Sequence, residues 1–249
     1  MNNIVFLKAF VSVFFILLSA SVKSVELNFI TLEVAPWAYK NSYGVVSGAF
    51  PDIVHELEKE TGYSIKVTLA PFGFSRIVRE LEAGRQDCTM IIEGKKREGK
   101  FFLGERVVDL PVGVIAKKNI ILNDYNDLKG LKVSVHKALE IVEGFTQDPL
   151  VKKEYDSGYE SGLRKIYHGR VDAVAGVLPT IKYLAKSVEM EEVLGFPLVL
   201  KKEPIYLQCS KKIKDVAYIK KLNKAIVSLR NSLAFKEVMK KNNMLFEGD

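Results

Sequence analysis

The chain has few of the residues that build metal centres, and no long hydrophobic run follows its start. Its 249 residues include 2 cysteines, 3 histidines and a single tryptophan. The cysteines are isolated and the histidines scattered, so no ligand spacing indicates a metal site, and we expect no cofactor. After residue 24, no segment has the roughly 20 apolar residues of a membrane-spanning helix. Without a Gly-x-Ser-x-Gly elbow or a Ser/His/Asp constellation, nucleophilic catalysis has no support.

Charge of one sign is also not concentrated anywhere. The 37 lysines and arginines exceed the 30 acidic residues, for a formal net charge of +7. Short basic patches such as Lys211–Lys214 are typical of solvated surface, so we expect no nucleic-acid partner. A modest positive field would still raise the rate at which an anionic solute is captured.

The first 24 residues are typical of a secretory signal peptide. Lys8 is the only charge before the apolar stretch Ala9–Leu18, and small residues follow as far as Ser24. This stretch of about ten residues is shorter than a membrane-spanning helix. Val22 and Ser24 suit a signal-peptidase site, so we expect cleavage before Val25. A retained N-terminal anchor is the alternative.

What the chain does have is one structural pattern that occurs twice. Residues 80–92 and 164–177 each contain the end of an amphipathic helix, a Gly-Arg-x-Asp turn and an apolar run. Gly84 and Gly169 suit the left-handed conformation that ends a helix. The apolar runs are continuous, which is typical of parallel strands covered on both faces. The repeat predicts two similar α/β lobes with a cleft between them, an architecture that suits a small molecule.

The rest of the pattern predicts how the two lobes are connected. Val107–Ala116 is expected to be a crossing strand, and Phe196–Leu200 with Ile205–Cys209 a return crossing that is interrupted at Lys201–Pro204. Two adjacent crossing strands would form a hinge. We therefore predict lobe 1 at residues 25–110 plus 203–249 and lobe 2 at residues 111–202.

With these residues in place, the chain resembles the extracellular solute-binding proteins of family 3. The resemblance depends on five segments in order, at residues 48–53, 81–87, 94–97, 127–133 and 169–174. It implies an α/β fold of the type II periplasmic-binding-protein kind, with two α/β lobes joined by two crossing strands. It also implies a periplasmic receptor, not an enzyme, that closes on a small acidic or zwitterionic, amino-acid-like solute. Such a receptor delivers its solute to the permease of an ABC transporter, and we expect it to be a monomer.

The resemblance gives Arg97 the role of binding the carboxylate of the solute. A guanidinium matches a carboxylate with two hydrogen bonds and keeps its charge when desolvated. The alternative is that Arg97 only ends an exposed basic loop. Gly94 stands in the place of the family's threonine, so one hydroxyl donor to the carboxylate is missing.

Lobe 2 departs from the family pattern in two places. Val177 stands where members that bind α-amino acids have an aspartate for the ammonium group, and a buried ammonium without a counter-charge is costly. Glu33 or Glu93 would then supply the charge from lobe 1, or the solute lacks an amine. His136 and Lys137 replace an anion-binding turn, where they would meet a second acidic group. A loop that faces solvent is the alternative there.

Aromatic and basic residues follow the first two predicted strands. Trp37 and Tyr39 come after the first strand, where family members have an aromatic residue against the ligand, and Phe74 and Arg76 come after the second. Ligands bind α/β sheets at the carboxyl ends of the strands. We therefore predict that these side chains line the cleft, with core or helix packing as the alternative.

The two cysteines are Cys88, which begins one strand, and Cys209, which ends another. Export would place them in an oxidising compartment, where a disulfide and two buried thiols both remain open. In the family fold the return strand runs antiparallel beside the third strand of lobe 1. The resemblance thereby implies that Cys88 and Cys209 lie close enough for a disulfide.

Two other functions remain open. One is a receptor that presents its solute to a membrane sensor. The other is an enzyme on the same fold, as the related cyclohexadienyl dehydratases are. For such an enzyme Glu33 or Glu93 would be the general acid, if burial raised its pKa.

Overall fold

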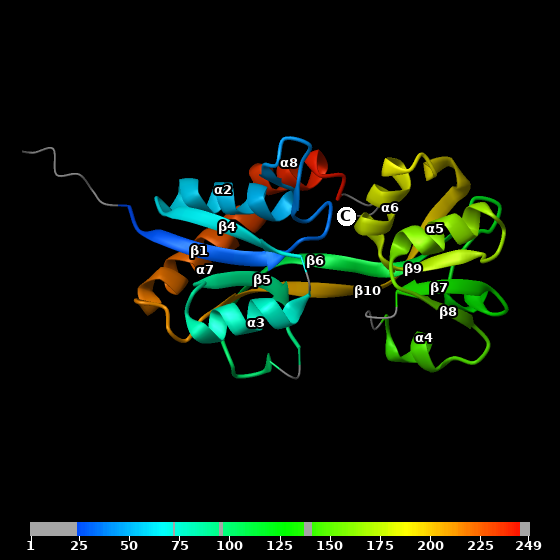
Figure 1. Ribbon diagram of the computed structural model, residues 1–249, viewed down its shortest axis with the longest axis horizontal. Coiled ribbons are helices and arrows are strands. Elements are labelled where there is room, and N and C mark those ends of the chain that lie inside the picture. Colours follow the sequence, from blue (N-terminus) through cyan, green and yellow to red (C-terminus); the bar gives the residue numbers. More distant parts are fainter. Residues whose placement is uncertain (1–23, 72, 95–96, 137–140, 245–249) are drawn as a thin grey trace, which may run out of the picture.

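A single mixed sheet runs the length of the molecule in the computed structural model, which describes residues 24–71, 73–94, 97–136 and 141–244. Its eight strands have the order β4-β1-β5-β10-β6-β9-β7-β8. Figure 1 shows one group of helices at each end of this sheet, with β6 and β10 running between the two groups. Residues 1–23 of the predicted signal peptide lie outside the described residues.

Lobe 1 is the end of the sheet that contains the first long strands. β1 pairs in parallel with β4 and with β5, because helices make the crossovers between them. Two C-terminal helices pack against the first crossover helix. The elements of lobe 1 are β1 (Glu26–Leu32), α2 (Ala49–Thr61), β4 (Ser64–Ala70), α3 (Phe74–Ala83), β5 (Cys88–Ile92), α7 (Val216–Arg230), α8 (Leu233–Lys241) and a small hairpin of β2 (Tyr39–Lys40) and β3 (Val46–Ser47).

Lobe 2 is the opposite end of the sheet. β7 pairs in parallel with both β8 and β9, so it repeats the central position of β1 in lobe 1. The elements of lobe 2 are η2 (Tyr125–Leu128), β7 (Lys132–His136), α4 (Glu143–Gln147), β8 (Lys152–Asp156), α5 (Tyr159–Tyr167), β9 (Ala173–Val177), α6 (Leu178–Ser187) and η3 (Glu191–Val193).

The two lobes are joined by β6 (Phe102–Lys117) and β10 (Leu194–Cys209), which pair antiparallel along their whole length. The sequence predicts a break in the return crossing at Lys201–Pro204, and the structure differs. β10 continues through this segment with a register shift between Val199 and Lys201. A bulge takes up the extra residue without ending the ladder. The predicted lobe boundaries, 110/111 and 202/203, thus fall inside continuous strands.

Each lobe has its own hydrophobic core on both faces of the sheet. In lobe 1, one cluster forms around Leu57 beneath α2 and α7, and a second forms around Ile77 beneath α3. In lobe 2, the corresponding clusters contain Phe145 on one face and Leu163 on the other. The continuous apolar runs of β5 and β9 are buried between these clusters, as their sequence pattern predicts.

The repeated Gly-Arg-x-Asp turn has one structure in both lobes. Gly84 after α3 has φ of 72° and Gly169 after α5 has φ of 68°, the left-handed region that glycine adopts without strain. The carboxylate of Asp87 accepts a backbone N–H of β1 at 2.7 Å, and that of Asp172 accepts a backbone N–H of β7 at 2.9 Å. Each aspartate therefore ties the strand that it begins to the central strand of its lobe.

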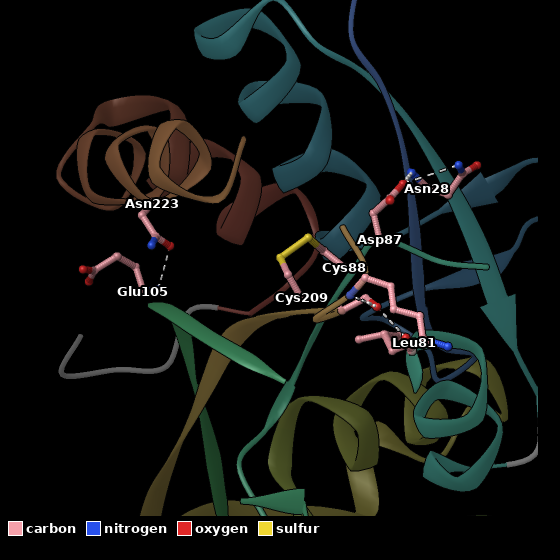
Figure 2. The surroundings of a disulfide bond; sticks show 9 residues. Asn28, Leu81, Asp87, Cys88, Glu105, Cys209 and Asn223 are labelled. Carbon is pink, nitrogen blue, oxygen red and sulfur yellow. Dashed lines mark hydrogen bonds between the residues drawn. A yellow bond between two sulfur atoms is a disulfide. The ribbon is translucent and has the colours of Figure 1, made fainter. Parts of the chain in front are cut away.

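A disulfide joins β5 to β10 in lobe 1 (Figure 2). Cys209 lies directly opposite Cys88 in the antiparallel pairing, with an S–S distance of 2.02 Å. Both cysteines are fully buried. Figure 2 also shows Asp87, which precedes Cys88, turned toward Asn28. The crosslink fixes the end of the return strand to the sheet before the chain enters α7.

Candidate functional site

The parallel strands of both lobes end at the hinge. In lobe 1, β5 ends at Ile92, which pairs with Ile205 of β10. In lobe 2, β9 ends at Val177, which pairs with Val112 of β6. Ile205 in turn pairs with Val108, so the two strand ends are separated by four residues of β6 (112 − 108), about 13 Å of extended chain. The loops after these strands therefore face each other, at the carboxyl ends where α/β sheets bind ligands.

Arg97 lies at the carboxyl end of β5 with its guanidinium half-buried. Its Nη2 donates to the carbonyl oxygen of Ile92 at 2.9 Å, and its Cζ is 4.9 Å from the centre of the Phe74 ring. Its Nε is buried without a hydrogen-bond partner among the described residues. Burial lowers the pKa of Arg97, but a guanidinium remains charged in proteins. This leaves a desolvated cation with a donor that an added acceptor could satisfy.

Gly94 makes room for this guanidinium. A Cβ at position 94 would lie 2.7 Å from Nη2 of Arg97. The side chain of a threonine and the observed position of Arg97 therefore exclude each other. Replacing the threonine of the family pattern by glycine removes a hydroxyl. It also leaves the space in which the guanidinium lies close to the backbone and donates to the Ile92 carbonyl oxygen.

The other predicted residues of lobe 1 lie at the same edge of the sheet in different environments. Arg76 is half-buried on α3, two residues after Phe74, whose ring contacts the guanidinium of Arg97. Glu33 is half-buried after β1, where its backbone N–H donates to Ala70 at the end of β4. Glu93 is exposed after β5. The structure thus brings charged groups of both signs to the ends of β1, β4 and β5.

Trp37 lies in the core of lobe 1, whereas the sequence predicts that it lines the cleft. It is 4% exposed, and its ring lies 5.4 Å from that of Phe50. The chain after β1 folds back over the start of α2, so closely that a Cβ at Gly48 would lie 2.7 Å from the Trp37 carbonyl oxygen. A large apolar side chain in this fold-back gains more from packing on α2 than from facing solvent.

Tyr39 makes a contact between the two lobes. Its ring lies 5.6 Å from that of Tyr183 on α6, and burial together with a hydrogen bond to Tyr39 raises the pKa of Tyr183. The sequence analysis did not single out Tyr183. Its only sequence signal is a position on the helix that follows β9, whose carboxyl end faces lobe 1.

Lobe 2 presents an aromatic and apolar surface at the hinge. Val177 packs against the cores of both lobes, and its backbone N–H donates to the hydroxyl of Tyr159 at 3.1 Å. The ring of the predicted His136 lies 5.4 Å from the Tyr159 ring. Lys137, the other basic residue predicted here, lies outside the described residues.

Tyr159 is the second residue of the site that the sequence analysis missed. A Cβ at Gly176 would lie 2.2 Å from the Tyr159 ring, so this glycine provides the space that the ring fills. Burial raises the pKa of Tyr159 to about 12. The Asp-Ala-Val-Ala-Gly sequence that ends in Gly176 could have indicated a close approach, but only the fold identifies which side chain approaches.

A separate cavity of about 550 Å³ lies on lobe 2. It is lined by Ser157, Gly158, Glu160, Ser161, Arg164, Lys165, His168 and Arg170. None of the predicted binding residues lines it, and Lys165 is already paired with Glu154 and Asp156. The hinge is the better candidate, because the predicted binding residues that the structure describes gather there from both lobes, whereas the lining of the cavity comes from lobe 2 alone.

Metal-binding clusters and membrane-spanning helices are both absent from the described residues. No group of three or more histidine, cysteine, aspartate or glutamate side chains there could hold a metal ion. No helix in the same part of the chain has the length and apolar character needed to cross a membrane.

Comparisons with known proteins give one family and one fold. The profile of the bacterial extracellular solute-binding proteins, family 3, matches residues 28–243. No curated protein matches the chain by sequence. A solved structure, the probable amino-acid ABC transporter extracellular-binding protein of Bacillus subtilis, is similar with a TM-score of 0.73 and 17% identity, over 89% of this chain and 99% of its own.

Two reconstructed ancestral proteins are also similar. A cationic amino acid solute-binding protein has a TM-score of 0.72 and 19% identity, over 87% of this chain and 95% of its own. An arginine-binding protein bound to arginine has a TM-score of 0.64 and 21% identity, over 87% of this chain and 97% of its own. At such identities the likenesses show the fold, and they confirm the predicted α/β fold class.

Proposed function

The chain belongs to the bacterial extracellular solute-binding proteins of family 3, and we propose that it binds a small, amino-acid-like carboxylate between its two lobes for an ABC transporter permease. Membership follows from the profile match over residues 28–243, which confirms the predicted family. The carboxylate, the closure of the lobes and the permease are our proposal.

The observation that carries the proposal is the state of Arg97. Its guanidinium is half-buried at the end of β5, and its Nε is buried without a partner among the described residues. Leaving a buried donor unsatisfied costs free energy, which a bound acceptor would recover. A carboxylate suits this donor, because its two oxygens match two N–H groups of one guanidinium. Arg97 follows β5, whose carboxyl end lies at the hinge, so a solute bound there would be able to contact both lobes.

Closure around the solute would use β6 and β10. Within the part of the chain that the structure describes, only these two strands continue from one hydrophobic core to the other, so small backbone changes in them would rotate one lobe against the other. The contact between Tyr39 and Tyr183 supports this arrangement, because it already brings the rims of the lobes together.

A receptor is favoured over an enzyme by the surroundings of the two candidate acids. A general acid at neutral pH needs a pKa that burial has raised. Glu93 is exposed and Glu33 is only half-buried, so neither is enclosed away from water. A role as a counter-charge to a solute suits both residues better.

Periplasmic localisation is part of the same proposal. We expect export with cleavage before Val25, because Val22 and Ser24 follow a short apolar stretch. The intact mass of the exported protein measures the cleavage site. Retention of residues 1–24 would contradict the assignment.

The experiment that tests the proposal begins with thermal shift against amino acids, dicarboxylates and opines, since a bound solute raises the unfolding temperature. Calorimetry with the best solute then compares wild type with Arg97→Ala. Truncating one partner of a buried charge pair costs about 2–5 kcal/mol, so affinity should fall by roughly thirtyfold to several thousandfold. Arg97→Lys should recover only part of the loss, because an ammonium cannot make the paired hydrogen bonds.

Arg79→Ala is the matched control. Arg79 is on α3 of the same lobe, with a side chain 71% exposed. Its removal should change affinity by less than about threefold, because exposed charges are screened. Equal losses for Arg79→Ala and Arg97→Ala would mean that Arg97 acts only through the general field, and the proposed carboxylate site would be wrong.

A further inference from the structure

We propose that the hydroxyl of Tyr159 donates a hydrogen bond to a second acceptor group of the solute, which makes the solute a dicarboxylate and not a simple α-amino acid. This inference rests on the proposed function, because it assumes that one carboxylate binds Arg97. It concerns the lobe 2 side of the same site.

The first step is the direction of the hydrogen bond at Val177. The backbone N–H of Val177 donates and the hydroxyl oxygen of Tyr159 accepts, at 3.1 Å. A phenol has one proton to donate besides its lone pairs. No group among the described residues accepts that proton. The O–H of Tyr159 is therefore available to a solute, and the oxygen is already engaged as an acceptor.

The second step is the protonation state. Burial raises the pKa of Tyr159 to about 12, so the phenol keeps its proton over the whole physiological pH range. It carries no negative charge that could balance an ammonium group. The hydroxyl oxygen already accepts a hydrogen bond from Val177, so the group that the hydroxyl can bind on the solute is an oxygen that accepts its proton.

The third step is position. Val177 packs against the cores of both lobes, so the Tyr159 hydroxyl lies at the junction and not on the outer surface of lobe 2. Arg97 is hydrogen-bonded to Ile92, whose strand ends about 13 Å along β6 from the end of β9. Closure would bring the groups that follow these two strand ends nearer to each other, so that a small molecule with an acceptor at each end can span them.

The fourth step is rigidity. The Tyr159 ring fills the space left by Gly176, where a Cβ would lie 2.2 Å away, and it also contacts the ring of His136. A donor held in place before binding loses little conformational entropy when the solute arrives. Tyr159 is thus a fixed recognition group. Its hydroxyl is hydrogen-bonded to Val177, the position at which the family pattern has a carboxylate.

The experiment uses the mature protein with succinate, glutarate and 2-oxoglutarate against L-alanine and L-lysine. The wild type should bind at least one dicarboxylate more tightly than either monocarboxylic amino acid. Tyr159→Phe keeps the ring and removes the donor, so affinity for that dicarboxylate should fall by about ten- to hundredfold. Affinity for L-alanine should stay within about twofold of wild type, because its single carboxylate is taken by Arg97.

Tyr155→Phe is the matched control, because Tyr155 lies on the neighbouring β8 and is 58% exposed. It should leave every affinity within about twofold. Thermal unfolding without solute checks that Tyr159→Phe keeps the fold.

The outcomes separate this inference from the proposed function. If Arg97→Ala abolishes binding and Tyr159→Phe matches wild type for every solute, the inference is wrong and the proposed function stands. A wild type that prefers L-lysine or L-alanine over all three dicarboxylates also overturns it. If no carboxylate stabilises the wild type, the proposed function fails, and the inference fails with it.

Discussion

Lobe 1 and lobe 2 contain the same turn but stabilise their sheets by different means. In both, an aspartate after a left-handed glycine accepts an N–H of the central strand, at 2.7 Å for Asp87 and 2.9 Å for Asp172. In lobe 1 the next residue is Cys88, whose disulfide fixes the return strand. Lobe 2 has no cysteine, and its equivalent support is a set of buried polar contacts.

These polar contacts are centred on Asp156 at the end of β8. Its carboxylate accepts hydrogen bonds from Ser134 at 2.6 Å and Ser161 at 3.0 Å, and it lies 2.9 Å from the ammonium of Lys165. Desolvation alone would raise the pKa of this carboxyl, but the bonds from Ser134, Lys165 and Ser161 outweigh it and hold the pKa below its usual range. A repeated turn therefore does not require a repeated core.

The two lobes also differ in what they bring to the hinge. Lobe 1 contributes the cation of Arg97, and lobe 2 contributes the neutral hydroxyl of Tyr159. Two lobes with the same strand arrangement can present different groups. The turn fixes where the strands lie, while the loops after the strands vary in sequence. The comparison of stability can be tested by four predictions, and the comparison of function by the binding experiments on Arg97 and Tyr159.

The largest effect is expected in lobe 1. The disulfide closes a loop with a sequence separation of 121 residues, so replacing both cysteines by alanine should lower the free energy of unfolding by about 2–5 kcal/mol. Urea denaturation measures the change in the free energy of unfolding. Hydrogen exchange should show that backbone amides of β1 and β5 lose protection before those of β7 and β9. Equal loss of protection in the two lobes would mean that the disulfide does not act on lobe 1 alone.

The next effect is expected in lobe 2. Asp156→Asn removes the charge that accepts three hydrogen bonds, so the free energy of unfolding should fall by about 1.5–3 kcal/mol at neutral pH. Glu154→Gln is the control, because Glu154 is 42% exposed and pairs with the same lysine. It should cost less than about 0.5 kcal/mol.

The pH dependence of the same contribution has a fixed sign. Folding lowers the pKa of Asp156 below its usual value of 3.8. The stabilising contribution of the charge is therefore complete at any pH above the unfolded-state pKa, and it is lost as the pH falls through the folded-state pKa. The stability gap between wild type and Asp156→Asn should therefore close in acid. A gap that persists well below pH 3.8 would contradict a role for the charge.

The smallest effect is expected at the repeated turn itself. Alanine at Gly84 or Gly169 would occupy the left-handed region at a cost of about 1 kcal/mol. A Cβ at Gly84 would also lie 3.0 Å from the Cβ of Lys212, whereas nothing lies within 4 Å at Gly169. Gly84→Ala should therefore be the more destabilising of the two in urea denaturation. The reverse order would show that the two turns are not equivalent in backbone strain.

Much of the fold could be predicted from the sequence because its signals are local. Continuous apolar runs identified β5 and β9, and Gly84 and Gly169 identified the ends of their preceding helices. The predicted break in β10 failed for a non-local reason, because pairing with β6 carries the strand through Lys201–Pro204 with a bulge. The charged and polar composition of that segment gives no sign of this pairing.

The candidate site divides in the same way. The sequence by itself determined the succession of helices and strands along the chain, the turn that begins β5 and β9, and an arginine in the basic loop after β5, since each depends on residues that are neighbours in the chain. Only the tertiary structure decided that Trp37 is buried on α2, that Tyr183 meets Tyr39, and that Tyr159 fills the space above Gly176. The physical reason is that burial and hydrogen-bond direction depend on which surfaces meet, and residues from separate elements meet only when the sheet places them side by side.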